Sequence, residues 1–302
     1  MKTKNIKIIG IVLALAAGTG ESQAQGSAAA QTQFAETSGR KIAFRSFGKG
    51  NPIVLVNRFR GTMDSWDPLF LDELARHHRI IIFDYTGIGE STGTLPTDIV
   101  AVAKDVKDLC DFLQLKKTAV LGWSYGGFVT QAALFQYPDL VTHAILVGTN
   151  PPGANPHDLE PIFLERALIP VNNFDDFTVL FFEPKSEVSK AAAKRSYDRI
   201  AKRFDVSKVP AKQEIFDLYF QGGATFKTDA YHWRDQLKKT QKPVLAVCGD
   251  HDICFPVENW YALARELPST QLIVFPHSGH GPQHQFPELT AQYITNFLQL
   301  TH

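Results

Sequence analysis

The sequence predicts an α/β protein built on a doubly wound, mostly parallel eight-stranded sheet with an inserted helical lid. Three observations predict this class: short apolar runs, amphipathic stretches between them, and one long helical segment that interrupts the alternation. Continuous apolar runs are typical of parallel strands that are covered on both faces. The stretches between them are long enough to serve as crossover helices, so we expect βαβ units.

The elements follow in a regular order along the chain. Two alternating segments, 34–37 and 41–47, predict an antiparallel hairpin at one edge of the sheet. The apolar runs that predict parallel strands are residues 53–56, 80–83, 119–121, 144–147, 244–247 and 272–275. The helical patterns that would cover the sheet are residues 99–113, 126–136, 257–267 and 289–300.

The alternation of strands and helices stops between residues 151 and 239, where the chain is helical in pattern, aromatic and interrupted by prolines. We interpret residues 151–239 as a cap, or lid, inserted into a core made of residues 25–150 and 240–302. Open α/β sheets bind ligands at the carboxyl ends of their strands. The insertion leaves the sheet after one strand and returns before another, and we therefore expect it to lie over that edge.

The first 24 residues have the three-part layout of a secretory signal peptide. Lysines lie within Met1–Lys7, an apolar stretch covers residues 8–17, and small residues stand two apart at Ser22 and Ala24. The apolar stretch is about half as long as a membrane-spanning helix. We expect cleavage after Ala24 and an exported protein, periplasmic or secreted, without stable membrane insertion; an uncleaved anchor is the alternative. Residues 25–33 predict a polar leader outside the core.

Composition and charge disfavour several classes of function. Apolar residues make up 44% of the chain and charged residues 21%, which is ordinary for a protein with a large core. Lysine plus arginine equals aspartate plus glutamate at 31 each, so no net charge favours nucleic acid or an anionic membrane. No metal-site spacing occurs, and a bridge between Cys248 and Cys254 is an open alternative to free cysteines. We expect a small-molecule substrate, no nucleic-acid partner, no metal and no cofactor; no oligomeric state is favoured.

One short motif carries the chemistry: Gly-Trp-Ser-Tyr-Gly at residues 122–126. It follows a predicted strand and precedes a predicted helix, which places Ser124 on a sharp strand-to-helix turn typical of a nucleophile. Glycine is needed at both ends because this strained turn brings the backbone close to neighbouring segments. Serine alone is a weak nucleophile, so a base and an orienting carboxylate must lie further along the chain.

Two later loops supply candidates for both groups. The loop after the fifth apolar run carries Asp250 and Asp252. The loop after the sixth run carries His277 and His280 and leads to His284. Both loops leave the carboxyl ends of parallel strands, as the serine turn does, so their side chains can converge at one edge of the sheet.

These motifs resemble those of the α/β-hydrolase superfamily, over about residues 32–301. The acid of that family is similar to the Asp in Gly-x-x-Asp-x-x-x-Pro, which here selects Asp252. The base resembles the His of a Gly-His-x-Pro stretch, which selects His280. The resemblance thus implies that Ser124 is the nucleophile, His280 the general base and Asp252 the carboxylate that orients the histidine. The residues not selected are interpreted as turn or solvated surface residues: Asp250, His277 and His284.

The resemblance also implies an oxyanion hole made by the backbone amides of Phe59 and Tyr125. Many relatives have His-Gly before the aromatic residue, whereas this chain has Asn57 and Arg58. The loss of the glycine constrains the loop and puts the shape of the hole in doubt. A turn at residues 84–91, Asp-x-x-Gly-x-Gly-x-Ser in pattern, resembles another family turn, and we expect it to have a structural role beside the elbow.

Three side chains near the elbow are candidates for the substrate pocket: Asn57, Arg58 and Trp123. Arg58 and its neighbour Arg60 can meet an anionic group of the substrate. The alternatives for these arginines are ion pairs with Asp64 or Asp67, or simple solvation. Packing is an equally good interpretation for Trp123.

The resemblance implies hydrolysis of a small carboxylic ester or lactone through an acyl-enzyme intermediate. Carbon–carbon bond hydrolysis and cofactor-free peracid formation of the haloperoxidase type use the same three residues and stay open as alternatives. A serine at the elbow argues against haloalkane dehalogenases and epoxide hydrolases, which resemble this fold but carry an aspartate there. A ligand sensor with a slow set of catalytic residues is the alternative from another class.

Overall fold

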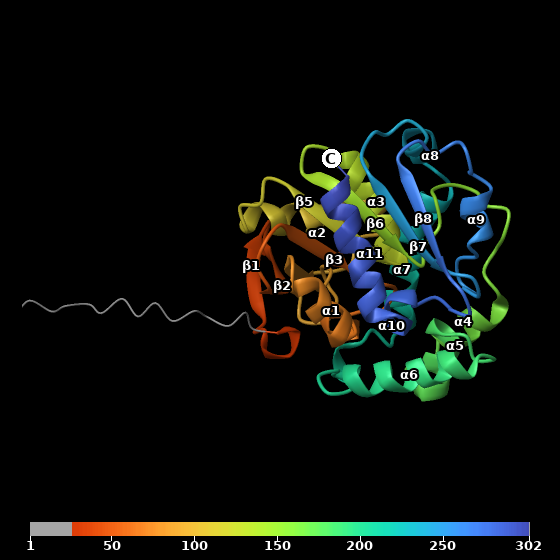
Figure 1. Ribbon diagram of the computed structural model, residues 1–302. Helices are drawn as coiled ribbons and strands as arrows, with labels where there is room; N and C mark the ends of the chain where they lie inside the picture. Colours follow the sequence, from red (N-terminus) through yellow and green to blue (C-terminus); the bar gives the residue numbers. More distant parts are fainter. Residues whose placement is uncertain (1–25, 302) are drawn as a thin grey trace, which may run out of the picture.

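The computed structural model describes residues 26–301; the predicted signal peptide and its cleavage site lie outside the described residues. The described strands form one eight-stranded sheet in the order β1-β2-β4-β3-β5-β6-β7-β8 (Figure 1). Their bounds are β1 (Gln33–Thr37), β2 (Arg40–Phe47), β3 (Pro52–Val56), β4 (Arg79–Phe83), β5 (Thr118–Trp123), β6 (Val141–Val147), β7 (Val244–Gly249) and β8 (Thr270–Phe275). The predicted doubly wound sheet is confirmed.

Pairing within the sheet follows the predicted pattern. It is antiparallel between β1 and β2 and between β2 and β4, and parallel across the other strands. Strand β3 lies between β4 and β5, so that Ile53 pairs with Ile80 on one side and with Ala119 on the other. Every residue of β5 and β7 is buried, which is why these strands are continuous apolar runs without polar alternation.

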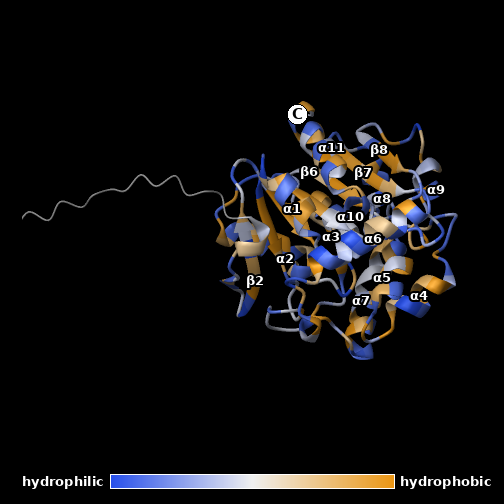
Figure 2. Ribbon diagram, turned by 60° about the horizontal axis from the view of Figure 1, so that its bottom comes forward, coloured by the Kyte–Doolittle hydropathy of each residue, from blue (hydrophilic) through white to orange (hydrophobic). Residues whose placement is uncertain are grey.

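Helices cover both faces of the sheet. Helix α1 (Pro68–Ala75) packs against α11 (Pro287–Leu300), and α2 (Ile99–Phe112) packs against α3 (Tyr125–Gln136), one pair on each face (Figure 1). The strands between them are mainly hydrophobic, and polar residues lie on the outer sides of the helices (Figure 2). The other helices are α4 (Pro161–Ala167), α5 (Phe174–Phe181), α6 (Glu187–Ile200), α7 (Gln213–Lys227), α8 (Trp233–Leu237), α9 (Glu258–Tyr261) and α10 (Pro282–Gln285).

Two helix predictions differ from the structure. The pattern at residues 257–267 predicted one helix, but α9 ends at Tyr261. Arg265 has a φ of 72°, a left-handed conformation that an α-helix does not tolerate. Helix α1 was not predicted, although Asp67 caps it by accepting a hydrogen bond from the Leu69 amide at 3.0 Å, with a proline in the first turn.

The residues before β1 are docked on the protein. Ser27–Ala29 forms a short 3-10 helix, and Ala30 is buried. The guanidinium of Arg203 donates hydrogen bonds to the carbonyl oxygens of Ser27, Ala28 and Ala30, at 3.0, 2.7 and 2.7 Å. The prediction of a leader outside the core is therefore wrong for Ala30, because an arginine from a distant helix end fixes this segment.

Between β6 and β7 the chain forms helices α4 to α8 and contributes no strand; we call residues 151–239 the insertion. Helices α4, α5 and α6 lie beyond the edge of the sheet at which β7 leads into its carboxyl-end loop (Figure 1). Arg60, on the loop after β3, donates hydrogen bonds to four insertion carbonyls, those of Ala167, Ile169, Pro170 and Pro210, at 2.6 to 2.7 Å. None of the helices in the described part of the chain combines the length and apolarity of a membrane span.

Candidate active site

Ser124 stands on a strained turn between β5 and α3. Its backbone has φ 60° and ψ −122°, a region that residues with a side chain rarely occupy, and its amide donates to the Val147 carbonyl oxygen at 2.9 Å. A Cβ on Gly122 would lie 2.0 Å from the carbonyl oxygen of Gly126, and one on Gly126 would lie 2.2 Å from that of Val56. The two glycines are therefore required by close backbone contacts, as the motif predicted.

His280 and Asp252 come together at the same edge of the sheet. The His280 Nδ1 lies 2.9 Å from Asp252 Oδ2 and 3.0 Å from Oδ1, and both side chains are buried. Asp252 Oδ1 also accepts hydrogen bonds from the amides of Cys254 and Phe255, at 2.8 and 2.9 Å. Because a carboxylate only accepts, Nδ1 must carry the proton, which leaves Nε2 of a neutral imidazole as the acceptor.

The acceptor nitrogen of His280 faces the nucleophile's cavity. Ser124 and His280 line one cavity of about 20 Å³, and His280 Nε2 is buried with no hydrogen-bond partner among the described residues. Phe163 of α4 and Phe181 of α5 pack on the imidazole, with ring centroids 5.4 and 6.3 Å away. A cavity of this volume holds about one water molecule, so a larger ligand requires the insertion helices to shift. We refer to Ser124, His280 and Asp252 as the candidate triad.

The residues that the resemblance did not select behave differently from one another. Asp250 is exposed and accepts a hydrogen bond from the Ser278 amide at 3.1 Å, and His277 is exposed, as expected. The interpretation of His284 as a solvated neighbour is wrong: its side chain is fully buried, and its Nε2 lies 3.2 Å from the Asp67 amide. Burial lowers the pKa of His284 to about 4, which keeps the imidazole neutral.

Asn57 holds the loop after β3 rather than lining a pocket. Its Nδ2 donates to the carbonyl oxygen of Phe83, and its Oδ1 accepts from the Trp66 indole, both at 2.7 Å. Tyr85 donates its hydroxyl to the Asn57 carbonyl oxygen, also at 2.7 Å. The residue is buried and does not belong to the lining of the small cavity, so its prediction as a pocket residue is corrected.

Of the two predicted oxyanion-hole residues, Phe59 lines the small cavity together with Ser124, and Tyr125 directly follows Ser124 in the chain as the first residue of α3. The first N–H groups of a helix have no acceptor within the helix, so the Tyr125 amide is oriented as a donor toward groups outside it. The hydrogen bonds of Asn57 fix the backbone two positions before Phe59.

The guanidinium groups of Arg58 and Arg60 have different surroundings, although both residues lie on the loop after β3. All four hydrogen bonds of the Arg60 guanidinium go to carbonyl oxygens of the insertion. Arg58 lines the small cavity and lies against the rings of Phe181 and Trp123. Ion pairs with Asp64 or Asp67 are not formed, because these carboxylates bind other arginines: Arg45 and Arg203 at Asp64, and Arg199 at Asp67.

Trp123 packs and does not line the small cavity. Its indole N–H donates to the carbonyl oxygen of His280 at 2.8 Å, and its ring lies 5.1 Å from that of Phe181 and 4.6 Å from that of His284. The packing interpretation is thus the one the structure supports. The aromatic contacts of the insertion on the imidazole were missed by sequence reasoning, whose only signal was the aromatic character of residues 151–239.

The turn after β4 has a structural role. Asp84 is buried and accepts hydrogen bonds from the amides of Met63 at 2.7 Å and Glu90 at 2.9 Å. Gly89 has a φ of 59°, and a Cβ there would lie 2.2 Å from Asp84 Oδ2. The turn also supports the loop after β3, because the hydroxyl of Tyr85 donates to the carbonyl oxygen of Asn57.

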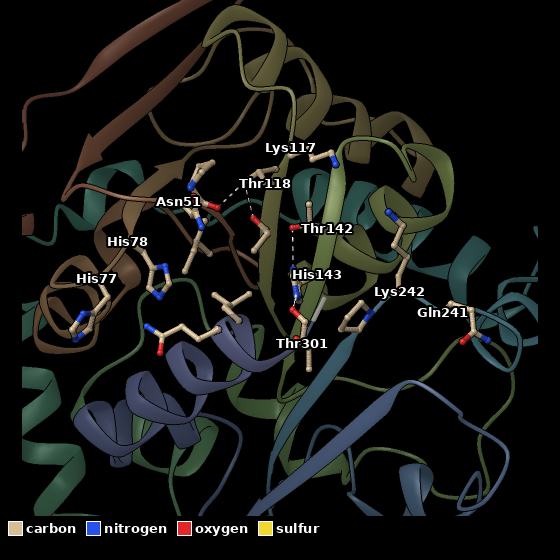
Figure 3. Close-up of a pocket in the computed structure, with 16 residues that line it drawn as sticks. Asn51, His77, His78, Lys117, Thr118, Thr142, His143, Gln241, Lys242 and Thr301 are labelled. Atoms are coloured by element: carbon tan, nitrogen blue, oxygen red, sulfur yellow. Dashed lines mark hydrogen bonds between the residues drawn. The ribbon is translucent and has the colours of Figure 1, made fainter.

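A much larger cavity, of about 950 Å³, opens at the amino ends of the central strands (Figure 3). Lys117, Lys242 and His143 lie around it, and His143 Nε2 is 3.1 Å from the Thr301 carbonyl oxygen. Its lining contains no serine, cysteine or carboxylate side chain. Within residues 26–301 no cluster of three potential metal ligands occurs, and the three cysteines are buried and free, so Cys248 and Cys254 form no bridge.

Comparisons with known proteins agree with this fold. Residues 51–287 match the model of the alpha/beta hydrolase fold family. An alpha/beta hydrolase fold protein from Chitinophaga pinensis is 29% identical, with a TM-score of 0.75, over 91% of this chain and 99% of that one. A thermophilic esterase from Thermogutta terrifontis is 26% identical, with a TM-score of 0.70, over 90% and 99%. A proline iminopeptidase from Pestalotiopsis fici is 26% identical over 88% of this chain and 99% of its own. The chain therefore belongs to the alpha/beta hydrolase fold family.

Proposed function

We propose that this protein is a serine hydrolase that cleaves a small carboxylic ester or lactone through an acyl-enzyme intermediate. The observation that carries the proposal is the pairing of a buried Asp252–His280 couple with a strained serine on one cavity. The acceptor nitrogen of the imidazole, Nε2, has no hydrogen-bond partner among the described residues. That combination activates a serine, which is otherwise a weak nucleophile.

The reaction proceeds in two steps. His280 Nε2 takes the proton of Ser124 Oγ as this oxygen attacks the carbonyl carbon, and Asp252 stabilises the imidazolium without taking its proton. The amides of Phe59 and Tyr125 hold the negative oxygen of the tetrahedral intermediate. The imidazolium then protonates the leaving alkoxide, and the acyl group stays on Ser124 until a water, deprotonated by His280, releases the acid.

The similarity to an esterase from Thermogutta terrifontis supports an ester as the substrate. Because the chain is also similar to a proline iminopeptidase, amides are the substrates against which esters should be compared. The equal numbers of acidic and basic residues favour a small molecule over a polyanion. We also propose that the protein is exported and that residues 1–24 are removed, so the chain tested should begin at Gln25.

A substrate panel tests the proposal. The chain from Gln25 onward and its Ser124→Ala variant are assayed on p-nitrophenyl esters of increasing acyl length, on five- and six-membered lactones, and on aminoacyl p-nitroanilides. We expect ester or lactone turnover that is lost in the variant and a much slower reaction with the amides. Preferred cleavage of a carbon–carbon bond in a diketone, or peracid formation from acetate and hydrogen peroxide, would replace ester hydrolysis with one of those chemistries.

Binding without turnover would give a different answer. A ligand sensor would bind an ester tightly and leave it intact over hours, whereas a hydrolase releases its products. Differential scanning of the Ser124→Ala variant with each unreacted ester identifies the esters that bind, because ligand binding raises the melting temperature of a hydrolase and of a sensor alike. Turnover of the bound ester by the wild type then separates the two cases, since only a hydrolase consumes it.

A further inference from the structure

The guanidinium of Arg58 lies in the candidate active site with almost no hydrogen-bond partner. Its Nη1 donates to the carbonyl oxygen of Phe59 at 2.7 Å, and its Nε is buried without a partner among the described residues. The rings of Phe181 and Trp123 lie 4.6 and 5.3 Å from its Cζ. These aromatic faces hold the guanidinium in place by cation–π contact but do not neutralise its charge.

Arg58 stands between two neighbouring cavities. The smaller is the one of about 20 Å³ that Ser124 and His280 line. The larger, of about 110 Å³, is lined from the insertion side by residues such as Tyr197, and Arg58 and Phe181 belong to both. Neither lining contains an aspartate or a glutamate, so the accessible part of the guanidinium faces enclosed space without an anion.

Protein groups near Arg58 do not offset its charge. The carboxylates of Asp64 and Asp67, the ion-pair partners considered for Arg58 from the sequence, are bound to other arginines. Burial, and then the positive charge of Arg60, lower the pKa of Arg58 to about 9. At neutral pH the side chain is therefore still a cation, and one whose ionised form is disfavoured until an anion comes beside it.

We propose that Arg58 binds a carboxylate of the substrate, so that the hydrolysed molecule is a monoanionic ester or lactone with its carboxylate a few bonds from the scissile carbonyl. The inference rests on the function proposed above and specifies its substrate class. A carboxylate offers the guanidinium two acceptors in one plane, which a neutral acyl chain does not. Because Arg58 and Ser124 line the same small cavity, the two substrate groups must lie close together.

Matched pairs of anionic and neutral esters test this. Monomethyl glutarate is compared with dimethyl glutarate for a carboxylate on the acyl side, and 4-acetoxybenzoate with its methyl ester for one on the alcohol side. The wild type should prefer the anionic member of at least one pair. In Arg58→Met the kcat/KM of that member should fall about 10- to 100-fold, mainly through KM, while the neutral member changes by less than 3-fold.

A matched control removes a charge elsewhere. Arg195→Met takes one exposed arginine from helix α6 of the insertion and should leave both members unchanged. Equal losses for both members in Arg58→Met would overturn the proposal and assign Arg58 to the oxyanion or to the loop. A wild type that prefers the neutral member of both pairs would overturn it as well.

A binding measurement separates this inference from the proposed function. Calorimetry on the Ser124→Ala variant is performed with free glutarate and free 4-hydroxybenzoate. These are the products that keep the carboxylate when monomethyl glutarate and 4-acetoxybenzoate are hydrolysed. Binding of one of them that weakens at least 10-fold in Ser124→Ala/Arg58→Met supports the carboxylate site even if no ester is turned over. Ester turnover by the wild type together with absent or Arg58-independent binding of both anions would keep the hydrolase and reject the carboxylate site.

Discussion

The two edges of the sheet carry very different cavities. At the amino edge a cavity of about 950 Å³ is lined by lysines, histidines and threonines (Figure 3). At the carboxyl edge the cavity beside Ser124 is only about 20 Å³. The larger cavity has room for a substrate, but its lining holds no serine, cysteine or carboxylate, whereas the smaller one is lined by Ser124 and by His280, which is bonded to Asp252.

The difference teaches that volume alone does not locate the chemistry. Cavities of ligand size are the usual first hypothesis for a site. Here the carboxyl edge is closed because aromatic residues of the insertion pack on His280. The strained turn and the buried Asp252–His280 couple are the costly features, and they occur only at the carboxyl edge of the described sheet.

The largest expected effect is the loss of activity when Ser124 or His280, at the carboxyl edge, is replaced. Replacing Ser124 or His280 by alanine should lower kcat on the best ester by about 10⁶-fold, because each variant removes one member of the nucleophile–base pair. The double variant should lose no more than either single one, since nucleophile and base act as a unit. Steady-state rates with far-ultraviolet circular dichroism as a folding control give the comparison; additive losses would mean that the two residues act separately.

Next in size is the orienting carboxylate. Asp252→Asn should lower kcat by about 10⁴-fold, because an amide facing Nδ1 favours the imidazole tautomer that cannot accept a proton at Nε2. Asp250→Asn, two residues away on the same loop, is the matched control and should keep at least a third of the activity. The reverse ranking of the two variants would transfer the acid role to Asp250.

Strand β3 reaches both edges and allows a third test. Asn57→Ala at the carboxyl end leaves the Trp66 indole and the Phe83 carbonyl without partners, which should cost about 2–6 kcal/mol of unfolding free energy. The displaced loop should also lower kcat. Asn51→Ala, beside the amino-edge cavity, should change neither by a measurable amount. Urea denaturation with parallel rate measurements compares the two variants. Equal unfolding free energies for Asn57→Ala and Asn51→Ala would contradict the role of Asn57 in holding the loop.

Acid should weaken the carboxyl edge through His284. Its folded pKa of about 4 lies below the ordinary value of 6.5, so between these values the unfolded chain binds a proton that the folded protein refuses. Its contribution to stability is present above pH 6.5 and falls by about 3 kcal/mol on going to pH 4. His284→Gln should lose that much less stability over the same interval; parallel unfolding curves of both proteins at pH 7 and pH 4 would refute the assignment.

The smallest effect belongs to the amino edge. Lys117→Ala and Lys242→Ala should each leave kcat/KM within 2-fold, because both side chains lie around the cavity opposite the candidate triad. Ester kinetics at low and high salt provide the measurement. A loss of more than 10-fold in either variant would mean that the open cavity takes part in the reaction.

Much of the fold could be predicted because buried parallel strands and crossover helices leave local patterns. The bounds predicted for the strand at residues 119–121 and for the helix after it differ from the observed ones by at most two residues. The helix predicted at 257–267 failed because apolar spacing does not report the left-handed backbone of Arg265. Helix α1 was missed although Asp67 and its following proline were visible signals.

The site divides in the same way. The elbow and the loops that carry Asp252 and His280 are local patterns, so spacing and resemblance could propose them. The different surroundings of Arg58 and Arg60 could not be foreseen, because the partners of Arg60 lie 107 to 150 residues away in the chain. The burial of His284 likewise depends on aromatic rings from other elements.

The central claim is that Ser124 is the activated nucleophile, and covalent labelling tests it most directly. The chain from Gln25 onward is treated with a fluorophosphonate, and the adduct is located by mass spectrometry of the intact protein and its peptides. One phosphonyl group per chain, on the peptide that carries Ser124 and lost in His280→Ala, is the predicted result. A folded protein that stays unlabelled, or a label on any residue outside residues 122–126, would contradict the account.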